Sequence, residues 1–230
     1  MSKSKAVFYR ELSYVLGLII MAFAAAFTEK ADLGMSMVVA PAYILHLKIS
    51  ELLPWFTFGV AEYAFQGLLV IITVIVMRRF KLSYLFSFVT AVIYGFMLDG
   101  MMALITLIPP AGFGLDMAFF LLGMLFCSFG VALLFHTYIA PEAYELLVKE
   151  VSSAFRWDIH RFKTVYDCVS CLVSVVMSFA VFGLWRLEGV KWGTVFCALV
   201  NGSMIGFCAR FMESRWTFED RFPLRRYFEV

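Results

Sequence analysis

Three acidic residues, Glu62, Asp99 and Asp167, lie inside long apolar stretches of the sequence. An ionised side chain at the centre of a bilayer costs about 3 kcal/mol on insertion scales, so such residues usually have a partner, a wet cavity or a role. We predict that Glu62 and Asp99 bind a substrate or a coupling ion, because no basic residue stands within two helical turns of either. For Asp167 an alternative stays open, in which it lies at the headgroup level near Arg161 and Lys163.

The elements that must position these acids are six apolar runs. The chain of 230 residues is 63% hydrophobic and 16% charged, whereas soluble domains are about half apolar and about a quarter charged. About 20 apolar residues in a helix cross a hydrocarbon core about 30 Å thick. The predicted spans are residues 11–28, 54–77, 82–108, 115–137, 162–185 and 192–212. We therefore predict an all-α polytopic membrane protein whose partner is lipid, and the formal charge of +2 gives no reason to expect nucleic acid.

The basic residues predict the orientation of these spans, because loops rich in Lys and Arg stay on the cytoplasmic side. With six crossings, one side holds only Lys30, Lys48, Arg186 and Lys191 of the 19 Lys and Arg residues, and the other fifteen fall on the side of the termini. Both termini are therefore expected in the cytoplasm.

The two halves of the chain repeat the same order of features. Residues 39–43 read Val-Ala-Pro-Ala-Tyr after the first span, and residues 139–144 read Ile-Ala-Pro-Glu-Ala-Tyr after the fourth. Each segment precedes a short re-entrant or amphipathic stretch and then a span with an acid beside a tyrosine. We predict inverted three-helix repeats over residues 1–114 and 115–212, an arrangement of many secondary transporters, with residues 213–230 as a cytoplasmic interfacial tail.

The repeat suggests where a binding site would lie. It pairs Glu62 with Asp167, and Asp99 with Asn201, so these four residues are expected to converge on a cavity between the halves. In the alternative interpretation, Asp99 and Asn201 bond one another or neighbouring backbone.

A gate is predicted beside the first span. Glu29, Lys30 and Asp32 precede a glycine and a run too short to cross, and Pro41 and Pro141 stand at matching points of the halves. Non-helical backbone at membrane depth is tolerated where it lines a cavity. The alternative is an external loop with surface ion pairs, in which both prolines simply begin helices.

Two short blocks resemble the YczE/YyaS/YitT group of bacterial membrane proteins. They are Lys-Ala-Asp-Leu-Gly at residues 30–34 and the stretch from Gly193 to Gly202 in the last span. The resemblance implies a six-helix protein of the bacterial cytoplasmic membrane with a presumed transport role, and it carries over no substrate or catalytic residue. The chain departs from the group at residues 135–138, Phe-His-Thr-Tyr, where a second copy of the first block is usual.

Other features have structural explanations as well as functional ones. Residues 141–155 have the pattern of an amphipathic helix on the cytoplasmic surface, where arginines of the tail would also meet lipid. The spacing Gly202-x-x-x-Gly206 suits packing within the chain or a seam between two copies, as in a homo-oligomer.

The leading functional prediction is transport of a small polar solute or ion by alternating access between the two halves. A second is a membrane-embedded binding subunit of a vitamin-type importer, and a third is an accessory or regulatory membrane protein. We predict no catalytic residue, metal or cofactor, because the sequence has no legible nucleophile with a base, metal cluster or phosphate loop.

Overall fold

A computed structural model describes residues 6–109, 112–183, 188–223 and 225. Within these ranges the protein is all-helical apart from one pair of short strands. Four residues used in the orientation argument, Lys3, Lys5, Arg186 and Arg226, lie outside the described residues.

Six of the described helices are long and apolar enough to cross a membrane. They are α1 (Arg10–Ala31), α3 (Phe58–Met77), α4 (Leu82–Ile105), α5 (Phe113–Phe135), α7 (Ile159–Phe182) and α8 (Trp192–Arg215). The prediction of six membrane-spanning helices is therefore confirmed in number, and their ends differ from the predicted ends by a few residues. Many apolar side chains on these helices are exposed on the protein surface, as expected where lipid rather than water is the solvent.

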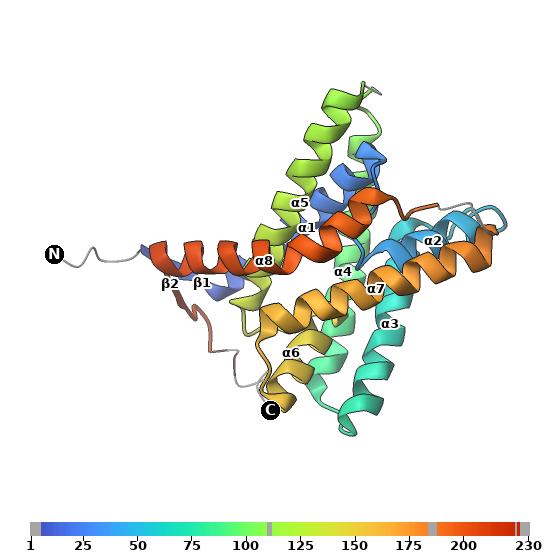
Figure 1. The fold of residues 1–230 in the computed structure, drawn as a ribbon. Helices are drawn as coiled ribbons and strands as arrows, with labels where there is room; N and C mark the ends of the chain where they lie inside the picture. The colour runs from blue at the N-terminus through green and yellow to red at the C-terminus, as the bar shows by residue number, and fades with distance from the viewer. Residues whose placement is uncertain (1–5, 110–111, 184–187, 224, 226–230) are drawn as a thin grey trace.

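Helices α1 and α5 pack closely against each other near the centre of the bundle (Figure 1). Small residues allow the close approach: a Cβ added at Gly17 would lie 2.9 Å from Leu134 Cδ2 and 3.2 Å from the Gly130 carbonyl oxygen. Gly123 meets the Ala24 carbonyl in the same way, at 3.0 Å. Small residues at such seams let helix backbones pack closely in lipid.

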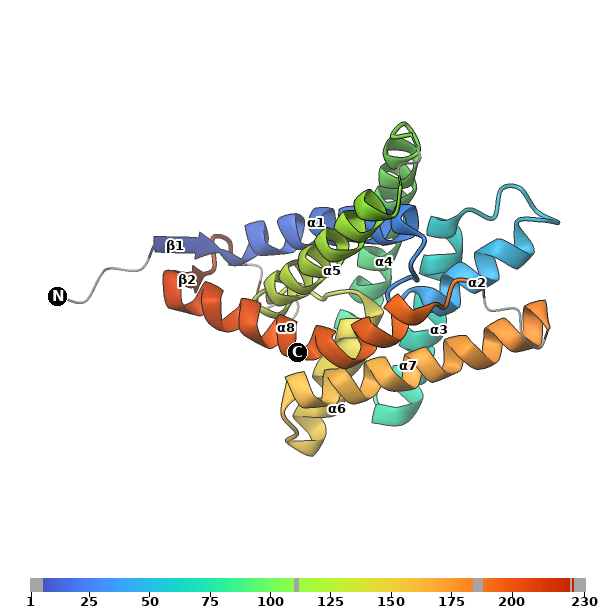
Figure 2. The same cartoon turned by 45° about the horizontal axis from the view of Figure 1, so that its top comes forward.

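The remaining long helices form two pairs, α3 with α4 and α7 with α8, which run in different directions (Figures 1 and 2). Gly202 and Gly206 of α8 face His160 and Thr164 of α7. Packing within the chain therefore accounts for this glycine spacing.

Two short helices fill the space between the pairs. Helix α2 (Ala40–Ile49) packs on α3 and α7, and α6 (Ala143–Phe155) packs on α3, α4, α5 and α7. The prediction of a surface helix at residues 141–155 is wrong for its first three turns, because α6 is buried through most of its length, including Glu145. Glu145 faces Lys163 of α7, and Lys149 donates to the Leu134 carbonyl of α5. Glu150 pairs with Arg79 and Lys81 between α3 and α4.

The two ends of the described chain meet in a parallel pair of strands, β1 (Ala6–Tyr9) and β2 (Trp216–Glu219) (Figure 2). Glu11 strengthens this junction by accepting hydrogen bonds from the backbone N–H groups of Arg221 and Phe222, at 3.1 and 2.9 Å. Within the predicted interfacial tail, residues 213–215 end α8 and residues 216–219 form a strand that ties the C-terminal region to the start of α1.

Candidate functional site

Gln66 joins two buried carboxylates at the contact between α3 and α6. Its side-chain nitrogen donates to Glu62 Oε1 at 3.3 Å and to Glu142 Oε2 at 2.9 Å, and its oxygen accepts from the Ala143 N–H at 2.9 Å. Glu62, Gln66 and Glu142 are all 0% exposed. The glutamine thus fixes the start of α6 against α3 and holds two like-charged groups close together.

An ion-pair network continues from α6 to α7. Lys163 Nζ lies 2.9 Å from Asp167 Oδ1, one helical turn away, and 3.6 Å from Glu145 Oε1. Asn201 of α8 lies beside Asp167 and accepts a hydrogen bond at 2.9 Å from Ser128 of α5. We call the buried set drawn from α3, α6, α7 and α8 the central cluster. Its members are Glu62, Gln66, Glu142, Glu145, Lys163, Asp167 and Asn201.

The charges of the central cluster do not balance. Four carboxylates face one ammonium, so the formal charge is four minus one, or three negative charges, if every group is ionised. Burial, followed by the like charges of Glu145 and Glu62, raises the pKa of Glu142 well above its ordinary value of 4.5. Bound protons or a bound cation must therefore compensate part of this charge.

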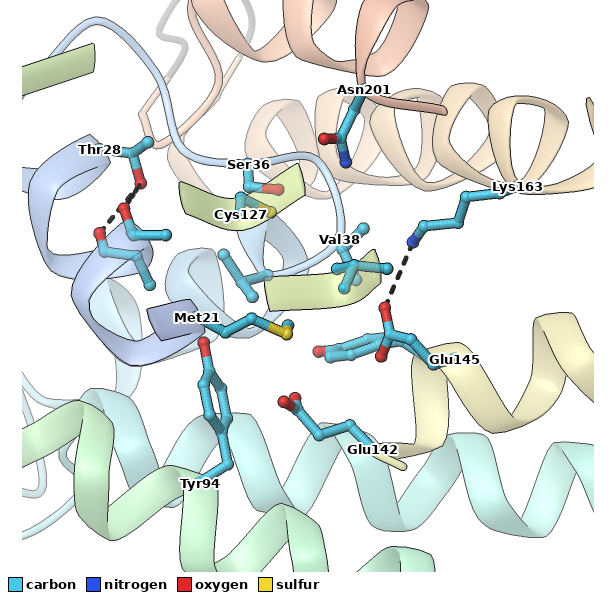
Figure 3. A pocket seen from close by; sticks show the side chains of 15 residues that line it. Met21, Thr28, Ser36, Val38, Tyr94, Cys127, Glu142, Glu145, Lys163 and Asn201 are labelled. Atoms are coloured by element: carbon cyan, nitrogen blue, oxygen red, sulfur yellow. Dashed lines mark hydrogen bonds and ion pairs between the residues drawn. The ribbon is translucent and has the colours of Figure 1, made fainter. Parts of the chain in front are cut away.

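A small cavity of about 30 Å³ adjoins the central cluster (Figure 3). Glu142, Glu145 and Lys163 reach it from one side, and Met21, Tyr94 and other residues of α1, α4 and α5 close it from the other. A cavity needs about 10–15 Å³ to hold one water molecule. This space therefore accommodates one or two waters or a small ion, and no organic solute in this conformation.

A second cavity, of about 90 Å³, lies between the end of α1 and the start of α8. Its lining includes Glu29, Asp32, Glu188 and Lys191, and it shares Thr28 with the central cavity. Lys191 Nζ lies 2.6 Å from Asp32 Oδ1 and joins the two helices across this outer cavity. Two of the predicted gate residues, Glu29 and Asp32, thus line a polar space next to the central one.

The other predicted gate residues have structural contacts. Lys30 Nζ donates to the Ile108 carbonyl at 2.6 Å. Pro41 lies in the first turn of α2, where a proline is tolerated. Pro141 precedes α6, and its carbonyl accepts a hydrogen bond from Ser87 at 2.6 Å. Each proline therefore stands at the entry of one short helix.

Of the four residues expected to converge, the structure places Glu62, Asp167 and Asn201 in the central cluster and leaves Asp99 outside it. Asp99 accepts hydrogen bonds from Thr57 Oγ1 at 2.7 Å and from the Gly59 N–H at 2.8 Å. It binds the first turn of α3, whose unpaired N–H groups attract a negative charge. Its position is explained by the structure of that helix terminus.

Sequence reasoning assigned no role in the site to four of its members, Gln66, Glu142, Glu145 and Lys163, and named Lys163 only as a headgroup-level neighbour of Asp167. The signal available for Gln66 was its position one turn after Glu62 in the same apolar run. The other three lie outside the central parts of the apolar runs, where charged residues are normally solvated. The Glu142 position in the repeated Ala-Pro segment was the available hint, because the first half has Ala42 there.

Six long apolar helices around a buried polar centre define an integral membrane protein. The chain belongs to a family of unknown function (DUF6198), which matches residues 8–210. This match does not tie the chain to the YczE/YyaS/YitT group in particular. No curated protein and no solved structure matches the chain.

Proposed function

We propose that this protein transports a small polar solute or ion across the membrane, with the central cluster as its binding site. The observation that carries the proposal is the central cluster itself, in which four carboxylates and one lysine, at most 1% exposed, lie beside a cavity lined by residues of α1, α4, α5, α6, α7 and α8. Ionisable groups in such a place are expensive and typically mark ion or substrate pathways. Stability alone would be served better by apolar side chains.

The helix contacts support the division into inverted repeats over residues 1–114 and 115–212. Contacts of α1 with α4, of α3 with α4 and of α2 with α7 have counterparts in α5 with α8, α7 with α8 and α6 with α3. Helices α1 and α5, the equivalent first helices, pack on each other. In transporters built this way, the two halves rock about a site at their interface.

The cavities suggest how access would alternate. On the outer side, the exposed Asp32–Lys191 ion pair joins the ends of α1 and α8 at the outer cavity, which shares Thr28 with the central one. On the inner side, Glu150 of α6 binds Arg79 and Lys81, which follow α3, at 3.1 and 2.9 Å. Breaking one set of contacts while keeping the other would open the cluster to one side at a time.

The basic residues and the pairing of β1 with β2 support both termini lying on one side, which we assign to the cytoplasm of a bacterial cell with the protein in its inner membrane. Helices α2 and α6 then act as re-entrant segments, entering between the spans from opposite sides. The repeated Ala-Pro segment lies at the start of each: Pro41 is in the first turn of α2, and Pro141 precedes α6.

The test is flux in vesicles that contain the purified protein and an entrapped pH-sensitive dye, under imposed gradients of protons, sodium or potassium. We expect flux above that of protein-free vesicles and its loss in Glu62→Gln and Asp167→Asn. Asp99→Asn is the matched control, since Asp99 lies outside the cluster, and it should retain flux. Flux equal to protein-free vesicles under every gradient would contradict transport of these ions and favour a binding subunit that needs partner chains.

A further inference from the structure

We propose that the central cavity binds one small monovalent cation, held between the carboxylates of Glu142 and Glu145 next to the Lys163 ammonium. This inference deepens the proposed function and rests on its central cluster, because it names the class of ion that the cluster takes.

The first support is a pair of carboxylate oxygens that lack partners. Glu142 Oε1 and Glu145 Oε2 are buried and accept no hydrogen bond from any residue that the structure describes. Their residues are 0% and 1% exposed, and both line the cavity (Figure 3). Buried polar atoms normally have partners. Two unpartnered oxygens at one small cavity point to a positively charged occupant.

The other oxygen of each carboxylate has a partner, which fixes its direction. Glu142 Oε2 accepts from Gln66 at 2.9 Å, and Glu145 Oε1 lies 3.6 Å from Lys163 Nζ. Each glutamate is thus anchored through one oxygen and leaves the other available. Carboxylate and hydroxyl oxygens are ligands that hard cations prefer, and the phenol of Tyr94 also lines the cavity.

The size of the cavity and the charge of its surroundings select a monovalent ion. About 30 Å³ holds an ion that has lost most of its hydration shell. Glu142, Glu145 and Lys163 together carry one net negative charge when all three are ionised, which one monovalent cation balances. Among the described residues, no three His, Cys, Asp or Glu side chains converge as they do around a divalent metal.

The outer cavity provides a route for such an ion. Three acidic residues, Glu29, Asp32 and Glu188, line it, and Lys191 is the basic residue of its lining. A cleft lined mainly by one sign of charge concentrates the opposite ions. A cation gathered there would pass Thr28, which both cavities share, to reach Glu142 and Glu145.

The experiment is thermal unfolding of the full chain, purified in detergent, at fixed pH and ionic strength. The probes are lithium, sodium and potassium chloride, with N-methyl-D-glucamine chloride as the reference salt and magnesium and calcium chloride as the divalent comparison. A ligand that binds only the folded state raises the unfolding midpoint in proportion to the logarithm of its concentration. We expect one alkali cation to raise the midpoint by on the order of a few degrees for each tenfold increase in concentration.

The variants locate the effect. Glu142→Gln and Glu145→Gln should lose the cation-dependent shift, while Glu51→Gln, which removes an exposed carboxylate paired with Lys48, should keep it. If either cluster variant fails to fold, equilibrium binding of the radioactive alkali cation to the wild-type protein replaces it. Equal midpoints in all monovalent salts together with no binding of the radioactive ion would overturn the proposal, as would a shift with divalent ions alone.

These outcomes separate the cation site from the transport function. Flux that needs Glu62 and Asp167 without any cation-dependent shift would leave transport standing and overturn the cation site. A cation-dependent shift without flux would leave the cation site standing and overturn the transport function.

Discussion

The central cluster and the Asp99 site both hold carboxylates inside long apolar helices, yet their hydrogen bonding differs. Both oxygens of Asp99 accept short hydrogen bonds, from Thr57 and from the Gly59 N–H. In the central cluster, Glu142 Oε1 and Glu145 Oε2 accept none from the described residues. A carboxylate whose partners are complete is explained by the fold, whereas one that keeps a free oxygen at a cavity is suited to an exchangeable occupant.

The two sites also differ in how charge is compensated. Asp99 is half-buried, and the N-terminal end of α3 supplies the positive potential it needs. The central cluster is buried and relies on Lys163, which lies within reach of Glu145 and Asp167. Changes at the cluster should therefore have larger and more ion-dependent effects than changes at the Asp99 site.

The largest effect is expected for Lys163→Met. Removing one partner of a buried ion pair leaves the other charge uncompensated, which typically costs about 3 to 5 kcal/mol. The free energy of unfolding, measured by detergent-driven denaturation in mixed micelles, should fall by about that amount. The control Lys48→Met removes an exposed pair with Glu51 and should cost less than about 1 kcal/mol.

A second substitution tests the reason for this loss. Adding Asp167→Asn to Lys163→Met removes one of the negative charges that the first change leaves without a partner. The double variant should therefore recover part of the lost free energy of unfolding. Equal losses in Lys163→Met and Lys48→Met, with no recovery in the double variant, would show that the cluster is not charge-coupled as the distances indicate.

An intermediate effect is expected for Asp99→Ala. The change removes two hydrogen bonds to a carboxylate, one of them from the first turn of α3, so the free energy of unfolding should fall by about 2 kcal/mol. Because Asp99 lies outside the central cluster, the cation-dependent shift in the unfolding midpoint should remain. Loss of that shift in a folded Asp99→Ala protein would contradict the separation of the two sites.

The sequence could predict the spans and part of the site, because these depend on local features. A run of about 20 apolar residues predicts a membrane span from its own composition, independently of the rest of the chain. An acidic residue within such a run is recognisable in the sequence, as Glu62 and Asp167 are. The same signal marked Asp99, however, and only the three-dimensional contacts distinguish its role.

The rest of the site could not be predicted because it depends on where a short helix packs. The sequence of α6 is amphipathic, as expected for a helix on the surface. A buried helix has the same pattern when its polar face meets other polar groups. The contacts that draw α6 into the bundle, such as Gln66 to the Ala143 N–H and Ser87 to the Pro141 carbonyl, join residues far apart in sequence. No local pattern encodes them.

The smallest effect, counted per unit of pH, is expected in the pH dependence of stability. Burial and the like charges of Glu145 and Glu62 hold the pKa of Glu142 above 4.5 in the folded protein. Among the described residues, the ionisable groups that face Glu142 from the elements around it include Tyr14, Glu62, Tyr94, Cys127, Tyr144, Glu145 and Lys163. The folded state therefore binds a proton that the unfolded chain releases as the pH rises past 4.5.

The contribution of Glu142 to the free energy of unfolding should consequently be greatest at low pH and decrease as the pH rises above 4.5 toward the folded-state pKa. One proton corresponds to about 1.4 kcal/mol per pH unit. Thermal unfolding between about pH 5 and pH 8 should show a shallower decrease in Glu142→Gln, which cannot ionise, than in the wild type. Glu51→Gln should keep the wild-type slope, since Glu51 is exposed. Identical slopes in all three proteins would mean that Glu142 carries no extra proton, and the bound cation would then have to balance its charge.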